Sequence, residues 1–173
     1  MFTDVNYLLE KKVSYELSIY ESSMTWFDIV NLVASIATAV GVILAAVGLW
    51  LAKIQSMTSF EDGVSNEYRQ IVKLIPVRAL LGDELSDEEF ENSLNDIYNY
   101  IDFTNEQIYL RQQGRIRKAT WNSWADGIET NLNRKSFKKA WEIIKEKSPN
   151  SFTELRRLEQ QAYKVDPKSW KVS

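Results

Sequence analysis

Two basic clusters between residues 111 and 139 are the part of this chain whose residue types and spacing could do chemistry. Their guanidinium and ammonium groups could contact the phosphates of nucleic acid or of anionic lipid. The candidate phosphate contacts are Arg111, Arg115, Arg117, Lys118, Arg134 and Lys138. Aromatic residues lie among these basic residues and could stack on bases, but Trp121 and Trp124 have the spacing of core positions, which favours packing.

Catalysis is not predicted. The chain of 173 residues contains neither cysteine nor histidine, which removes thiolate nucleophiles, imidazole bases, disulfides and most transition-metal sites. Calcium or magnesium bound through carboxylates stays open. Glu88, Glu89 and Glu91 crowd a predicted helix start, where negative charge complements the helix dipole. We therefore expect no enzymatic activity, no cofactor and no metal site.

The element that dominates the sequence runs from residue 26 to residue 53. Between Ile29 and Ala52 it carries no formal charge, and at about 1.5 Å per helical residue it can cross a hydrocarbon core of roughly 30 Å. Aromatic rings at Trp26, Phe27 and Trp50 suit the headgroup region at its two ends. This pattern predicts one transmembrane helix, and Thr25 followed by an acid at position 28 has the spacing of a capping box at its start.

The small residues of this helix are sorted onto one face, with alternating spacings of three and four. The predicted oligomer interface consists of Ala34, Thr38, Gly41, Ala45, Gly48 and Ala52. The bulky residues follow the same spacing on another face, at Val33, Ile36, Val40, Ile43, Val47 and Trp50. Helices in lipid associate where small side chains let backbones approach, so this arrangement predicts a homo-oligomer.

A polar line overlaps the small face in the first half of the span. The candidates for lining a water-filled pore are Asp28, Asn31, Ser35 and Thr38. Polar groups at membrane depth normally face protein or water, so in a ring of helices this line could border a lumen. The alternative is that Asp28 caps the helix while Ser35 and Thr38 hydrogen-bond to their own backbone.

The parts outside the span predict an all-α chain of five segments. Residues 1–25 are an amphipathic segment without the pattern of a signal peptide, 26–53 the transmembrane helix, 54–82 a connecting helix, 83–165 a helical domain, and 166–173 a loose tail. Ser86, Ser136 and Ser151 are expected to cap successive helices. Lysine and arginine near the span are sparse, so a short acidic N-terminal segment only weakly favours a cytoplasmic C-terminal domain.

Charge is divided unevenly along the chain. Residues 1–110 carry an excess of acidic residues and residues 111–173 an excess of basic ones. We expect the acidic and basic helices to pair within one subunit or between subunits, which is the alternative to a phosphate-binding role for the basic clusters.

Residues 58–82 and 100–142 carry Asn-Glu-Gln, Gly-Arg-Ile, paired tryptophans and Phe-x-x-Ala-Trp. In these features the chain resembles small bacterial membrane proteins with one membrane helix and a cytoplasmic helical domain. In size and layout it is similar to the membrane accessory proteins of type VI CRISPR systems. The resemblance implies a ring-shaped pore that depolarises the inner membrane during phage infection. Such accessory proteins have been linked to HEPN ribonuclease domains, but the HEPN motif needs a histidine, so no ribonuclease is expected here.

The leading hypothesis is therefore a homo-oligomeric bacterial inner-membrane protein, single-pass, that forms a pore in antiviral defence. Its expected partners are copies of itself and the lipid bilayer, with a CRISPR effector or RNA as a further possibility. The alternatives are a membrane-tethered binding module, which recruits RNA or a protein through its basic helices without conducting ions, and a structural anchor.

Overall fold

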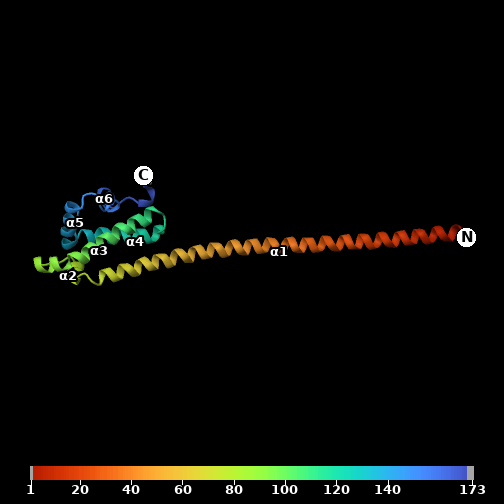
Figure 1. The fold of residues 1–173 in the computed structure, drawn as a ribbon, viewed down its shortest axis with the longest axis horizontal. Helices are drawn as coiled ribbons and strands as arrows, with labels where there is room; N and C mark the ends of the chain where they lie inside the picture. The colour runs from red at the N-terminus through yellow and green to blue at the C-terminus, as the bar shows by residue number, and fades with distance from the viewer. Residues whose placement is uncertain (1, 171–173) are drawn as a thin grey trace. The chain divides into compact units, whose positions relative to one another are not determined.

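The computed structural model describes the backbone of residues 2–170 and the side chains of residues 6–20 and 25–170. This part of the chain is all helical, without a strand, as the sequence predicts. The helices are α1 (Phe2–Val72), α2 (Val77–Leu81), α3 (Asp87–Gln112), α4 (Lys118–Leu132), α5 (Lys135–Lys147), α6 (Thr153–Gln160) and the 3₁₀ helix η1 (Pro167–Ser169) (Figure 1). Contacts divide the chain into two compact units, Met1–Lys53 and Ile54–Ser173, and the boundary falls where the predicted span ends.

Helix α1 is continuous through the place where the sequence predicts a helix start. No helix starts near Thr25, so the capping box predicted there is wrong, and residues 1–25 are not separated from the span by a break. The amphipathic segment is helical from Phe2 onward, although the side chain of Val5 lies outside the described residues. The helix passes Gly63 unbroken and ends at Val72, which confirms that the span continues into the connecting segment.

The turns that follow α1 obey local rules. Helix α2 ends at Gly82, whose φ of 90° is the left-handed conformation that glycine adopts without steric cost. Ser86 then caps α3: its hydroxyl oxygen accepts the Glu89 backbone N–H at 3.3 Å, and the Ser86 backbone N–H donates to the Glu89 carboxylate at 2.9 Å. This reciprocal capping box confirms the predicted start of α3.

Replacing Ser86 with alanine should lower the free energy of unfolding of the helical domain by about 1 kcal/mol. The loss comes from one backbone N–H of the first turn, which has no other partner in the helix. Ser151→Ala is the matched control, since Ser151 is exposed and does not cap α6. Thermal unfolding followed by tryptophan fluorescence checks both variants, and equal shifts would contradict the assignment of the cap to Ser86 alone.

Three expectations about the C-terminal part are wrong. Ser136 lies inside α5 rather than at its cap, and α6 is preceded by Phe152, not Ser151. Residues 166–170 are not a loose tail: they form η1, and Pro167 and Trp170 are buried. The indole N–H of Trp170 donates to Gln161 Oε1 at 3.0 Å, which fixes the end of the described chain against the α6 segment.

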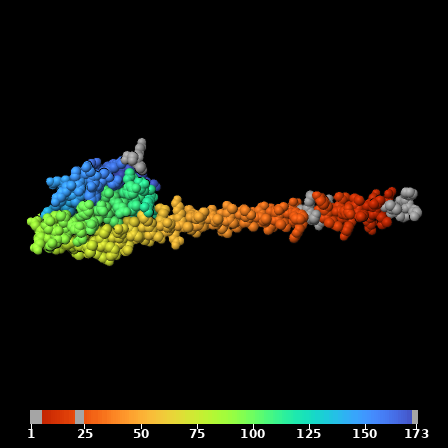
Figure 2. All heavy atoms as spheres, viewed as in Figure 1, coloured from red at the N-terminus to blue at the C-terminus, as the bar shows by residue number. Residues whose placement is uncertain are grey.

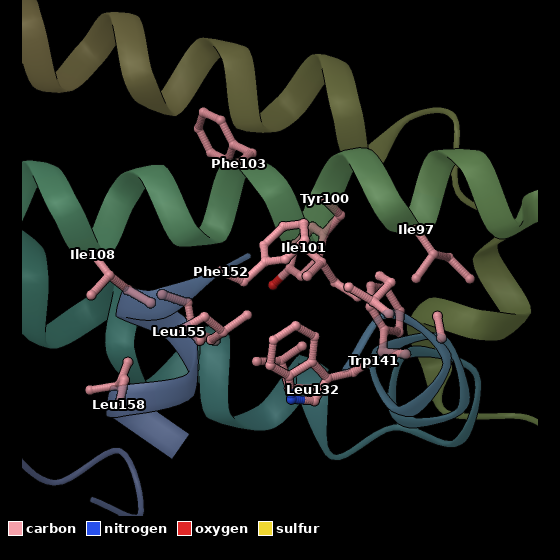
Figure 3. Close-up of a cluster of buried hydrophobic side chains, with 14 of the residues drawn as sticks. Ile97, Tyr100, Ile101, Phe103, Ile108, Leu132, Trp141, Phe152, Leu155 and Leu158 are labelled. Atoms are coloured by element: carbon pink, nitrogen blue, oxygen red, sulfur yellow. The ribbon is translucent and has the colours of Figure 1, made fainter. Parts of the chain in front are cut away.

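The core of the second unit forms around α3. Figure 3 shows Ile101 and Ile108 on the side of α3 that faces Leu155, while Phe103 points from the opposite side of the same helix. Trp141 lies in this cluster and is almost fully buried, with its ring 5.8 Å from that of Phe152. Figure 2 shows the atoms coloured yellow through green to blue as one closely packed body. This unit therefore buries its own apolar side chains without residues 1–53.

Candidate functional site

The small face of α1 is uncovered in the single chain. Every described side chain from residue 25 to residue 53 is exposed, including all six residues of the predicted oligomer interface. A Cβ atom added at Gly41 or at Gly48 would meet no atom within 4 Å beyond the neighbouring helical backbone. The helix thus presents an uninterrupted face on which a second backbone could approach closely, as the spacing predicts.

The polar line beside this face satisfies its hydroxyl donors internally. Ser35 donates to the backbone oxygen of Asn31 at 2.8 Å, and Thr38 donates to that of Ala34 at 2.8 Å. Both bonds belong to the alternative in which these residues bond to their own backbone. The part of that alternative which concerns Asp28 is wrong, because α1 has no start at that position for it to cap. The hydroxyl oxygens keep their capacity to accept hydrogen bonds.

The structure does not assemble the six predicted phosphate contacts into one surface, because four of them interact within the chain. Arg115 lies over the ring of Phe60, with its guanidinium carbon 4.2 Å from the ring centroid. Arg134 donates to the side-chain oxygen of Asn131 at 2.5 Å. Among the described residues of this set, Arg115, Lys118 and Lys138 are exposed and make no side-chain hydrogen bond, and of these three only Arg115 has a cation–π contact.

Arg111 is the clearest correction among these residues. Its guanidinium is buried, with 4% of the side chain exposed, and donates to both carboxylate oxygens of Asp166 and to the Ile116 backbone oxygen at 2.6 Å. The bond from Arg111 lowers the pKa of Asp166 below its ordinary value, despite the opposing effect of burial. Arg111 therefore joins α3 to η1 and is not available to phosphate.

Arg117 is held by Glu61, a residue that the sequence analysis does not single out. The carboxylate of Glu61 accepts from the Arg117 backbone N–H at 2.6 Å, from the Arg117 guanidinium at 2.6 and 2.9 Å, and from the Thr120 hydroxyl at 2.8 Å. The N-cap residue of α4, Arg117, makes no side-chain cap of its own. Glu61 of α1 instead accepts the backbone N–H at this helix start, where a negative charge also complements the helix dipole. Burial raises the pKa of Glu61, but these hydrogen bonds outweigh it and the net pKa is lowered.

The position of Glu61 on α1 is a signal that the sequence contains. Glu61, Val64, Tyr68 and Ile71 recur at spacings of three and four, and the first two are buried. An acid on the apolar face of a helix needs a cationic partner, because an unpaired buried charge is costly. The sequence therefore indicates that Glu61 needs a cationic partner, but it does not identify Arg117, which lies far along the chain.

The remaining acidic pairing follows the charge division of the sequence. Lys139 of α5 lies 3.1 Å from Asp87 of α3, which confirms pairing between an acidic and a basic helix within one chain, and Lys135 of α5 lies 2.9 Å from Glu84 in the loop before α3. Among the side chains that the structure describes, no group of three acidic residues is arranged to hold a metal ion.

Fold and site together define a class: an all-helical protein with one N-terminal helix that is long and apolar enough to cross a membrane. The buried core helix of a soluble protein would meet the same criterion of length and composition, but no residue of this apolar segment is buried. No family model, no curated protein and no solved structure matches this chain.

Proposed function

We propose that this protein is a homo-oligomeric, single-pass protein of the bacterial inner membrane whose assembled α1 helices form a pore that depolarises the membrane. The observation that carries the proposal is that every described side chain of an uncharged helix segment is exposed, although the other unit of the chain has a core of its own. Such a segment needs an apolar environment, which the bilayer supplies, and its small face needs a packing partner, which a second copy supplies.

The assembly would place the small face at helix contacts and the bulky face against lipid. Val40, Ile43 and Val47 are about half exposed or more in the single chain, as acyl-chain contacts would require. A mean spacing of 3.5 residues keeps the small face in register along a left-handed crossing. The helical unit then lies in the cytoplasm, where it holds the assembled helices or responds to a signal.

Conduction would follow the polar line. Because Ser35 and Thr38 already donate to the backbone, their oxygens remain as acceptors, and Asp28 adds a carboxylate at one end. A lining rich in acceptors and negative charge favours cations over anions. A role in antiviral defence, with a CRISPR effector or RNA as the activating partner, is proposed from the resemblance in layout.

The double variant Gly41→Leu/Gly48→Leu should convert a large oligomer into a monomer, because two leucines keep the facing backbones apart. The mass of the full chain in detergent and ion leakage from liposomes measure assembly and conduction. Val40→Leu/Val47→Leu is the control, since it places two leucines at the same separation of seven residues on the lipid-facing side, and it should keep both properties. A wild-type monomer, or a double glycine variant that assembles normally, would rule the proposal out.

The second candidate is the membrane-tethered binding module. The hydrogen bonds from the Ser35 and Thr38 hydroxyls to the backbone favour it, because hydroxyls satisfied in this way need no water-filled lumen. In that case the full chain would assemble without leakage from liposomes. Recruitment of RNA would then depend on Lys118 and Lys138 and would survive the double glycine variant.

A further inference from the structure

A groove of about 300 Å³ opens in the second unit, between the last turns of α1 and helices α3 and α4. Its walls combine aromatic and polar side chains, a combination typical of sites for small molecules, and its volume lies at the lower end of the range for such sites. Of its lining residues, Asn131 accepts a hydrogen bond from Arg134. The residues that line the groove include Tyr68, Arg69, Tyr100, Gln107, Trp124 and Gly127.

Gln107 lines this groove from α3. The residue is 4% exposed, and its amide makes no hydrogen bond to any described residue. Its neighbours on α3 differ: the Thr104 hydroxyl donates to the Tyr100 backbone oxygen at 2.8 Å, and the Tyr100 hydroxyl accepts from Asn131 at 2.7 Å. The Gln107 amide atoms are not among the fully buried polar atoms without a partner, so they reach the open space of the groove, where they can donate to and accept from a ligand.

Flat apolar surfaces surround this amide. The rings of Tyr68 and Tyr100 lie edge to face, with centroids 6.2 Å apart, and Trp124 is partly buried on the α4 side of the groove. Burial raises the pKa of Tyr100 to about 12, so its hydroxyl stays neutral at physiological pH. Such surfaces suit the face of a planar ring, because stacking on aromatic side chains stabilises any base.

The charge of the groove is positive. Arg69 is exposed, makes no side-chain hydrogen bond to any described residue, and is the only charged residue among the described residues that line the groove. A free guanidinium matches a phosphate or carboxylate in a bidentate geometry. The ligand therefore needs a negative group as well as a planar ring.

Gly127 leaves space in the groove that another residue would fill. It lies inside α4, where glycine costs about 1 kcal/mol relative to alanine, and an added Cβ would meet no atom within 4 Å. Local helix stability does not explain a glycine at this position, whereas an open groove does.

We propose that this groove binds a mononucleotide, with the base against Tyr68 and Trp124, the base edge on the Gln107 amide, and the phosphate on Arg69. A nucleotide combines a planar ring, donors and acceptors on one edge, and negative charge in a single small molecule. The volume fits one nucleotide rather than two. The proposal goes beyond the pore and is independent of it, since every residue of the groove belongs to residues 54–173.

Titration calorimetry of the full chain in detergent with AMP, GMP, CMP and UMP tests this site. We expect at least one of the four to bind, and to bind at least tenfold more tightly than its nucleoside and than inorganic phosphate. Absence of binding by all four would overturn the proposal, whatever the mass of the oligomer. Equal binding of nucleotide and nucleoside would overturn the role of Arg69.

Three variants locate the site. Gly127→Leu fills the groove and should weaken binding at least tenfold, whereas Gly63→Leu adds the same bulk outside the groove, in open space on α1, and should not. Gln107→Leu should also weaken binding at least tenfold, because it removes the amide that would meet the base edge, and the thermal midpoint shows that the variant is folded. Arg69→Gln should abolish the preference for nucleotide over nucleoside.

Gly127→Ala separates groove filling from a general effect on α4. Alanine should raise the thermal midpoint and keep most of the affinity, since it adds one methyl group to an open space. Unchanged affinity in both Gly127→Leu and Gln107→Leu would show that nucleotides bind elsewhere and would overturn the proposal.

Discussion

Replacing Asp166 with alanine is expected to lower the free energy of unfolding of the helical domain by about 3 kcal/mol. The reason is the guanidinium of Arg111, which would stay in the core without its carboxylate partner. Only 4% of the Arg111 side chain is exposed, compared with 30% for Asp166, so the remaining charge could not reach water without moving η1. Asp166→Ala should therefore also free Trp170, whose burial depends on η1.

Thermal and chemical unfolding of the full chain in detergent, followed by tryptophan fluorescence, measures this loss. Asp126→Ala is the control, since Asp126 is an exposed acid of α4 with no hydrogen bond to any described residue, and it should change stability by less than about 0.5 kcal/mol. The pairing would be unimportant if both variants unfolded at the same midpoint. The double variant Arg111→Leu/Asp166→Ala should recover part of the loss, because it leaves no unpaired charge.

The helices that could be predicted from the sequence are those whose boundaries depend on neighbouring residues. Ser86 and Glu89 are three residues apart, so the capping box at the start of α3 can be read locally, and Gly82 ends α2 for an equally local reason. The apolar segment of α1 needs only composition and length. These signals act within one or two helical turns, and no knowledge of the tertiary fold is required.

The expectations that were wrong depended on tertiary contacts. Phe152 precedes α6 with a φ of 59°, which is unfavourable for a phenylalanine, and its buried ring packs against Trp141 and Tyr98. Ser151 therefore loses the cap position that its spacing with Glu154 predicts. Arg111 has the same polar character as the exposed arginines, and only the position of Asp166, far along the chain, makes it a core residue.

The groove could be predicted only in part. Thr104 and Gln107 occupy core positions of α3, in register with Ile97 and Ile101, and polar residues at such positions indicate either a hydrogen-bond partner or a ligand. The sequence cannot show which of the two is without a partner. The oligomer interface and pore candidates on α1 stay predictions, since a single chain leaves that face without its neighbour.

Glu61→Gln is expected to destabilise the same domain by about 2 kcal/mol, because hydrogen bonds to a charged group are lost where the acceptor is buried. The amide keeps the size of the carboxylate, but its NH₂ group would face the Arg117 guanidinium, and both would be donors. Glu67→Gln is the matched control, an exposed acid of α1 with no hydrogen bond to any described residue. Similar unfolding midpoints for the two variants would show that Glu61 does not stabilise the contact between α1 and α4.

The pH dependence of stability gives an independent test of Glu61. Its pKa is lower in the folded state than its ordinary value of 4.5, so as pH falls below about 4.5 the unfolded chain takes up the proton first. The stabilisation is therefore fully present above this pH and is lost as pH falls through the lowered pKa of the folded state. Asp166 adds a loss of the same sign, in a window below its own ordinary value of 3.8.

Unfolding midpoints of wild type and Glu61→Gln at pH 7 and pH 3.5 separate the contribution of Glu61 from that of other acids. The wild type should lose more stability between the two pH values than the variant does, because the variant has no proton to take up at position 61. An equal loss would mean that the Glu61 carboxylate is not held by Arg117 and Thr120. In that case the contacts of α1 with the domain would be those of Val64, which is buried in the core, and of Phe60 with Arg115.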